Sequence, residues 1–112
     1  MIGASPFEIR SEPGAAGVRL RLSGELDIAS AARLEDAVAA ARAQGASRVL
    51  LDMGALSFVD SSGLRMCILL SARAAEEGWT LELTRPPEPP LSVFRMTGAE
   101  ENLPFIEESE GS

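Results

Sequence analysis

The residues best suited to chemistry form a polar segment, Asp60-Ser61-Ser62-Gly63, between two apolar stretches of the chain. The apolar run of residues 49–51 comes before it, and a run of helical length begins at Leu64. A carboxylate and two adjacent hydroxyls would therefore stand where a helix begins, beside backbone N–H groups that lack partners within the helix. Such a segment could hold a nucleophile, bind phosphate, cap the helix or present a hydroxyl to another protein.

The first two of these roles lack the other residues that they need. The chain has no histidine, whereas Ser-His-Asp and Cys-His hydrolases need an imidazole base and most catalytic zinc sites need an imidazole ligand. The segment is not Gly-x-Ser-x-Gly, and it lacks the glycine spacing and the lysine of a phosphate-binding loop. The single cysteine, Cys67, falls in an apolar helical stretch, where cysteine is usually a small buried hydrophobe. We therefore expect no enzyme, no cofactor and no metal site.

Two interpretations of Ser61 remain. A hydroxyl at the start of a helix most often caps it and contributes about 1 kcal/mol. Gly63, however, permits a close backbone approach that a cap does not require, so Ser61 could be presented to a partner and phosphorylated, with Ser62 as second choice. A phosphoryl group would add about −1.5 to −2 charge at a helix N-terminus, which favours anions. The nearby carboxylates of Asp60 and Asp27 would then help to repel a partner that binds the unmodified form.

Two further groups of residues could belong to a partner-binding surface. Met66 and Leu69 lie opposite the expected core face of the helix, where a helix facing water would be polar. Leu70 and Ala74, to one side of them, are expected to pack on the next helix. Glu25 and Asp27 end an earlier strand, and we favour a solvated rim over a catalytic pair because no sugar-sized cleft can be argued. The predicted partner-binding residues are Glu25, Asp27, Asp60, Ser62, Gly63, Met66 and Leu69.

The elements that must position these residues alternate along the chain. Residues 7–9 and 18–22 alternate apolar and polar side chains, which predicts two strands joined by the turn at 13–17. Further strands are expected at 49–51 and 79–83. A first helix is expected from its N-cap, Ser30, to Gly45, with Ala31, Leu34, Val38 and Ala41 on its buried face.

Two more helices complete the prediction. The second runs from Leu64 to Gly78, and its expected core face consists of Leu64, Cys67, Ile68, Ser71 and Ala75. A proline-rich connector at 86–90 leads to a short helix from about Leu91 to Thr97, which Gly98 ends. Leu103, Phe105 and Ile106 are available for docking. Two strand-helix-strand crossovers imply parallel pairing in the middle of the sheet.

The composition bounds the class of protein. One α/β domain is expected over residues 1–112, with a core at about 7–106, a fraying acidic tail at 107–112, and a mixed sheet of four to five strands that opens with an antiparallel hairpin. The net charge is 10 − 17 = −7, so nucleic acid is not an expected partner. We expect neither a membrane span nor a secretory signal, and a cytoplasmic location follows as the default.

Three segments together resemble successive landmarks of the anti-sigma factor antagonist family, the STAS domain. They are Gly24-Glu25-Leu26-Asp27 after a strand, residues 57–64 (SFVDSSGL) before a helix, and residues 93–98 (VFRMTG). The resemblance covers about residues 7–106, and its central segment is specific when the other two occur in register.

The resemblance implies a small cytoplasmic switch. Unmodified members of this family bind an anti-sigma factor that is itself a serine kinase, and thereby release the sigma factor. The kinase then phosphorylates the serine directly after the aspartate of the motif, here Ser61, and a serine phosphatase restores the active form. Asp27 matches a family aspartate that helps to shape the site. The alternative is a STAS subunit or adaptor of a membrane-transport or stress-signalling assembly.

Overall fold

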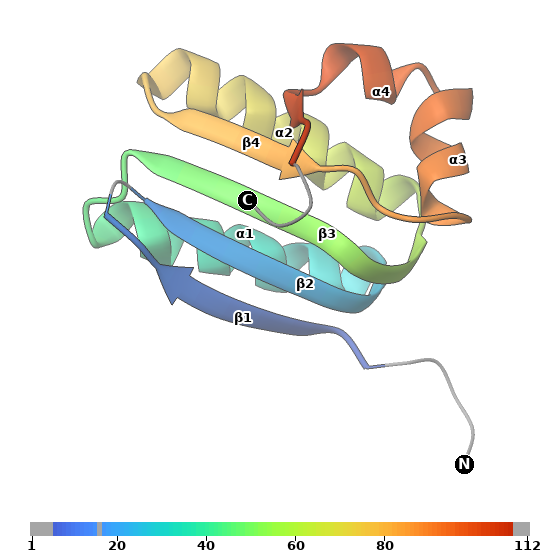
Figure 1. The fold of residues 1–112 in the computed structure, drawn as a ribbon, viewed down its shortest axis with the longest axis horizontal. Helices are drawn as coiled ribbons and strands as arrows, with labels where there is room; N and C mark the ends of the chain where they lie inside the picture. The colour runs from blue at the N-terminus through green and yellow to red at the C-terminus, as the bar shows by residue number, and fades with distance from the viewer. Residues whose placement is uncertain (1–5, 16, 109–112) are drawn as a thin grey trace.

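One mixed sheet with helices on one face makes up the computed structural model, which describes residues 6–15 and 17–108 (Figure 1). The strands lie in chain order across the sheet; β1 and β2 are antiparallel and each later pair is parallel. The elements are β1 (Glu8–Pro13), β2 (Val18–Leu26), α1 (Ile28–Ala43), β3 (Arg48–Val59), α2 (Ser61–Glu77), β4 (Thr80–Thr84), α3 (Pro90–Met96), α4 (Ala99–Asn102) and β5 (Phe105–Ile106). The predicted α/β fold with an opening hairpin is confirmed.

The core lies between the sheet and the helices α1 and α2, which are seen behind the sheet in Figure 1. Alternate residues of each strand point to this side, so that Leu20, Leu51 and Leu83, which share one row of the parallel register, are all buried. The predicted buried face of α1 is confirmed. The other face of the sheet, here called the open face, carries charged side chains.

The start of α1 differs from the prediction. Asp27, not Ser30, is its N-cap, and Ser30 is the third helical residue of a capping box. Both residue types cap helices well, so the sequence alone did not separate them. Because the helix begins three residues earlier than expected, the carboxylate of Asp27 is committed to the helix.

The buried face of α2 is also rotated relative to the prediction. Leu64 and Cys67 are buried as expected, and so are Leu70 and Ala74, whereas Ile68, Ser71 and Ala75 do not belong to the core face. Ile68 is 47% exposed, and it lines a groove of about 440 Å³ between α2 and the α3–α4 region with Ser71 and Ala75. Burial raises the pKa of the Cys67 thiol to about 12, as expected for a small buried hydrophobe.

The far end of α2 holds the only tryptophan of the sequence. Gly78 ends the helix in the left-handed conformation, and Trp79 follows with its ring buried. Its indole N–H donates to a Glu77 carboxylate oxygen at 2.9 Å, and the Arg42 guanidinium lies 5.1 Å from a ring centroid. The indole at this end of the core is therefore held by a hydrogen bond to Glu77 and a cation–π contact with Arg42.

The C-terminal region contains two elements that the sequence did not predict as such. α3 matches the predicted short helix within one residue at each end, and the left-handed Gly98 separates it from α4. β5 pairs parallel with β4, and its Phe105 ring meets the Phe94 ring edge to face at 5.6 Å between centroids. Of the expected fraying tail, Glu107 and Glu108 form ion pairs with arginines. Residues 109–112, like position 16 of the predicted turn, lie outside the described residues.

Candidate functional site

The candidate site lies where β2 and β3 end side by side. Leu26 and Val59 are aligned in the parallel register, so Asp27 and Asp60, which follow them, occupy neighbouring positions. The Asp60 N–H donates to the Leu26 carbonyl oxygen at 3.2 Å, and each aspartate caps the helix that it precedes. We call Glu25, Asp27, Asp60, Ser61, Ser62 and Gly63 the polar edge.

Asp27 is held by its own helix. Its Oδ1 accepts hydrogen bonds from the backbone N–H of Ala29 and of Ser30, at 3.1 and 3.0 Å. The Ser30 hydroxyl lies 2.9 Å from the same oxygen and 2.7 Å from the Glu25 carbonyl oxygen. The hydrogen bonds from Ser30 lower the pKa of Asp27. This carboxylate is therefore ionised at neutral pH and fixed in position.

Asp60 plays the same part for α2. Its Oδ1 accepts hydrogen bonds from the N–H groups of Ser62 and Gly63, at 2.9 and 3.0 Å. The interpretation of Ser61 as the cap is therefore wrong, because Ser61 is the first residue inside the helix. Its side chain is not needed to satisfy the helix N-terminus.

Gly63 sets how closely α2 approaches the sheet. A Cβ atom at this position would lie 2.6 Å from the Leu26 carbonyl oxygen, 2.7 Å from Leu26 Cγ and 2.9 Å from a Val59 methyl carbon. Distances of this size are below van der Waals contact, so a side chain would push the helix away. The predicted close backbone approach thus exists, and it is made to the end of β2.

The two serines differ in accessibility. Ser61 is exposed, and within the described ranges its hydroxyl has no hydrogen-bond partner. Ser62 is half-buried, and its backbone N–H is engaged by Asp60. The polar edge therefore presents the Ser61 hydroxyl, which has no partner among the described residues, beside the Asp60 carboxylate, which caps α2. A hydroxyl in that state can accept a group from another protein.

Exposed apolar side chains occur on the elements that carry the polar edge, although not all are those predicted. Leu69 is 45% exposed, but Met66 is half-buried against the core. Sequence reasoning missed Ile28, which is 75% exposed at the start of α1, and Phe58, which is 43% exposed. A period-two interpretation could have found Phe58, because it precedes the buried Val59 and so points to the other face.

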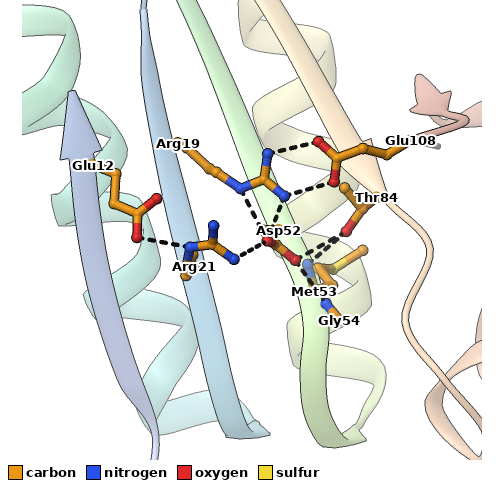
Figure 2. A network of polar contacts seen from close by, with 8 residues as sticks. All are labelled: Glu12, Arg19, Arg21, Asp52, Met53, Gly54, Thr84 and Glu108. Atoms are coloured by element: carbon orange, nitrogen blue, oxygen red, sulfur yellow. Dashed lines mark hydrogen bonds and ion pairs between the residues drawn. The ribbon is translucent and has the colours of Figure 1, made fainter. Parts of the chain in front are cut away.

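A second polar centre lies on the open face, around Asp52 of β3 (Figure 2). Its Oδ2 accepts hydrogen bonds from Arg19 at 2.7 and 3.0 Å and from Arg21 at 3.0 Å. Its Oδ1 accepts from the Gly54 N–H at 3.0 Å, and the Thr84 hydroxyl lies 3.3 Å away. We call this centre, together with Glu12 and Glu108, the Asp52 network.

The charges of the Asp52 network hold three strands and the C-terminal segment together. Glu108 accepts two hydrogen bonds of 2.6 Å from Arg19, and Glu12 accepts one of 2.7 Å from Arg21. Burial alone would raise the pKa of Asp52, but hydrogen bonds from Gly54 and Arg19 outweigh it, so the pKa lies below its usual value. The hydrogen bond from Arg19 likewise lowers the pKa of Glu108.

Within residues 6–15 and 17–108, no group of three or more histidine, cysteine, aspartate or glutamate side chains is arranged to hold a metal ion. Over the same ranges, no helix is both long enough and apolar enough to cross a membrane.

A comparison with known protein families identifies the family of this domain. Residues 10–107 match the family model described as "Mlab, STAS domain". The chain belongs to the STAS domain family. The polar edge of this STAS domain thus lies at the motif on which the sequence resemblance was based.

Individual relatives agree with the assignment. The STAS domain is 32% identical over 77 residues to BtrV of Bordetella bronchiseptica, which is named an anti-sigma factor antagonist; the match spans 69% of this chain and 66% of that protein. Among solved structures, it is similar to the anti-sigma factor antagonist SpoIIAA in its unphosphorylated form, with a TM-score of 0.74, 24% identity, and coverage of 92% of this chain and 90% of the other. The phosphorylated form of SpoIIAA, described as a Bacillus cell fate determinant, gives a TM-score of 0.69 at 24% identity over 92% and 93% of the chains. The structural likenesses establish the fold.

Proposed function

We propose that this STAS domain is an anti-sigma factor antagonist that works in the cytoplasm as a binding module and is not an enzyme. Its unphosphorylated form would bind an anti-sigma factor that is a serine kinase, and phosphorylation of Ser61 would end the complex. A serine phosphatase would then restore the binding form. The name of the relative BtrV supports the class of function, and the two solved forms of SpoIIAA are consistent with a protein that exists with and without phosphate.

The observation that carries the proposal is the state of the Ser61 hydroxyl. It is exposed at the first position of α2, and within the described part of the chain nothing hydrogen-bonds to it. Asp60 caps the helix, so a phosphoryl group on Ser61 would not disrupt the capping hydrogen bonds. Ser62 is the second choice because it is half-buried.

The partner surface in this proposal combines charge with apolar contacts. It includes the predicted residues Glu25, Asp27, Asp60, Ser62, Gly63, Met66 and Leu69, to which we add the exposed Ile28 and Phe58. Apolar side chains beside polar groups are typical of protein interfaces. A phosphate placed among these carboxylates would add repulsion and desolvation cost, and a penalty of roughly 3 kcal/mol would weaken binding about a hundredfold.

Labelling with ATP and a cognate kinase tests the acceptor. Wild type and Ser62→Ala should each gain one phosphate, while Ser61→Ala should gain none, as measured by intact-protein mass spectrometry. Equal labelling of Ser61→Ala would overturn the assignment. The phosphorylated wild-type protein should then bind the kinase about a hundredfold more weakly than the unmodified protein in a calorimetric titration.

A second candidate function is a subunit or adaptor of a membrane-transport or stress-signalling assembly. It stays open because the matching family model carries the name Mlab, whereas the anti-sigma names belong to other proteins. Co-purification from the native host separates the two functions. A serine kinase bound to the wild-type protein but not to Ser61→Asp supports the first candidate, and a membrane-transport complex supports the second.

A further inference from the structure

The outer edge of β1 offers an unpaired row of backbone groups. β1 has β2 on one side and no strand on the other within the described sheet. Half of its N–H and C=O groups therefore point away from the sheet, as in any edge strand. Arg33 donates a 2.8 Å hydrogen bond to the Phe7 carbonyl, so the free edge begins at Glu8. The opposite edge of the sheet, β5, has only two residues.

The charges on β1 are satisfied unequally. Glu8, Arg10 and Glu12 share the open face, since they alternate along the strand. Glu12 is paired with Arg21, but Arg10 stands directly across from the same Arg21, which is a like-charge pair. Over the described ranges, neither Glu8 nor Arg10 has an ion pair. The two unpaired charges are thus of opposite sign and two residues apart on the free edge.

We propose that this edge pairs with β1 of a second copy of the chain, in an antiparallel ladder centred on Ile9. In that register Glu8 lies opposite the partner's Arg10, and Arg10 lies opposite the partner's Glu8. The two-fold axis makes the two contacts identical, as a symmetric dimer requires. Each unpaired charge of β1 gains a partner, and the two sheets join into one.

Other registers fit less well. Centring the ladder on Arg10 would place Arg10 opposite the partner's Arg10 and Glu8 opposite the partner's Glu12, so that like charges would meet at every position on this face. Centring it on Ser11 would use Glu12, which Arg21 already engages, and would place Ile9 opposite the partner's Pro13, which has no N–H to donate. The register centred on Ile9 avoids both problems.

Sedimentation velocity over a concentration series tests the dimer. The wild-type protein should show a reversible monomer–dimer equilibrium. Arg10→Glu should raise the dissociation constant about tenfold or more, since both ion pairs become like-charge contacts. The double variant Glu8→Arg/Arg10→Glu restores both pairs with the charges exchanged, so its dissociation constant should return to near the wild-type value.

Arg65→Glu is the matched control, because it makes the same change in net charge at an exposed position on α2. It should leave the dissociation constant within about twofold of wild type, and far-ultraviolet circular dichroism should show that every variant is folded. The proposal is overturned if the wild-type protein stays monomeric throughout the series. It is equally overturned if Arg65→Glu weakens the dimer as much as Arg10→Glu, or if the double variant stays as weak as the single one.

Discussion

Asp52 lies within β3 and Asp60 directly after it, and the two carboxylates accept hydrogen bonds from different kinds of donor. Asp52 is bound mainly by side chains from other strands, and the neighbouring hydroxyl, Thr84, is buried and also accepts the Met53 N–H at 2.9 Å. Asp60 is bound by backbone N–H groups of its own helix, and the neighbouring hydroxyl, Ser61, has no partner among the described residues. A carboxylate satisfied by the backbone leaves the adjacent hydroxyl free for another protein. We therefore expect the Asp52 side chain to matter mainly for stability and the Ser61 side chain mainly for function.

The largest change in stability is expected for Asp52→Asn. The substitution keeps the shape but removes the charge that Arg19 and Arg21 share, and we expect a loss of roughly 2 to 3 kcal/mol in the free energy of unfolding at neutral pH. Because the folded-state pKa of Asp52 is depressed, its contribution is present above the usual value of 3.8 and is lost as the pH falls through the folded value. Denaturant titrations should show the wild type and the variant converging in acid. If the difference in the free energy of unfolding between wild type and variant were the same in acid as at neutral pH, the charge of Asp52 would not contribute to stability. Phosphorylation of Ser61 by the kinase should be unchanged in Asp52→Asn.

The next largest effect is expected for Gly63→Ala. The added methyl would meet the Leu26 carbonyl at 2.6 Å, so α2 must shift at a cost of about 2 kcal/mol. Gly14→Ala is the control, because the nearest atom to its added carbon is 3.8 Å away. Since the shift also moves Ser61, labelling by the kinase should slow in Gly63→Ala alone. Equal stability of the two variants in denaturant titrations would contradict the close packing.

The smallest changes in stability are expected for variants of the N-cap Asp60 and of its neighbour Ser61. Asp60→Ala removes two capping hydrogen bonds and should cost about 1 kcal/mol in the free energy of unfolding. Ser61→Ala removes a hydroxyl without a described partner and should change that free energy by less than about 0.5 kcal/mol. Thermal melts of both variants would measure the difference. A larger loss for Ser61→Ala would mean that the hydroxyl has a structural role.

The sequence was sufficient wherever the pattern is local. Alternating residues such as Val18, Leu20 and Leu22 predict a strand, and the Asp-Ser-Ser-Gly segment before an apolar run predicts a helix start. The choice between Ser30 and Asp27 as cap failed because both are good caps, and only the folded capping box decides between them. Which serine a kinase modifies remains a prediction.

What could not be predicted depends on contacts between distant segments. Arg19 and Asp52 are 33 positions apart, and only the register of β2 on β3 brings them together. The core face of α2 differs from the prediction at Ile68, which is as apolar as Leu70, because the packing of α2 on α1, β3 and β4 decides which side chains are buried. β5 has two residues, too few for any periodicity, so its pairing with β4 is a tertiary effect.

The position of Trp79 determines which events an optical experiment can follow. It is the only tryptophan and the chain has no tyrosine. Ser61 begins α2, which is 17 residues and about 25 Å long, and Trp79 lies just beyond the other end of the helix. Its fluorescence will therefore change when the protein unfolds, as the indole loses Arg42 and Glu77 and enters water. Phosphorylation at the other end of the helix should leave the emission unchanged. The fluorescence of Trp79 thus reports unfolding of the native chain. An optical measurement of Ser61 phosphorylation needs a dye attached near Phe58.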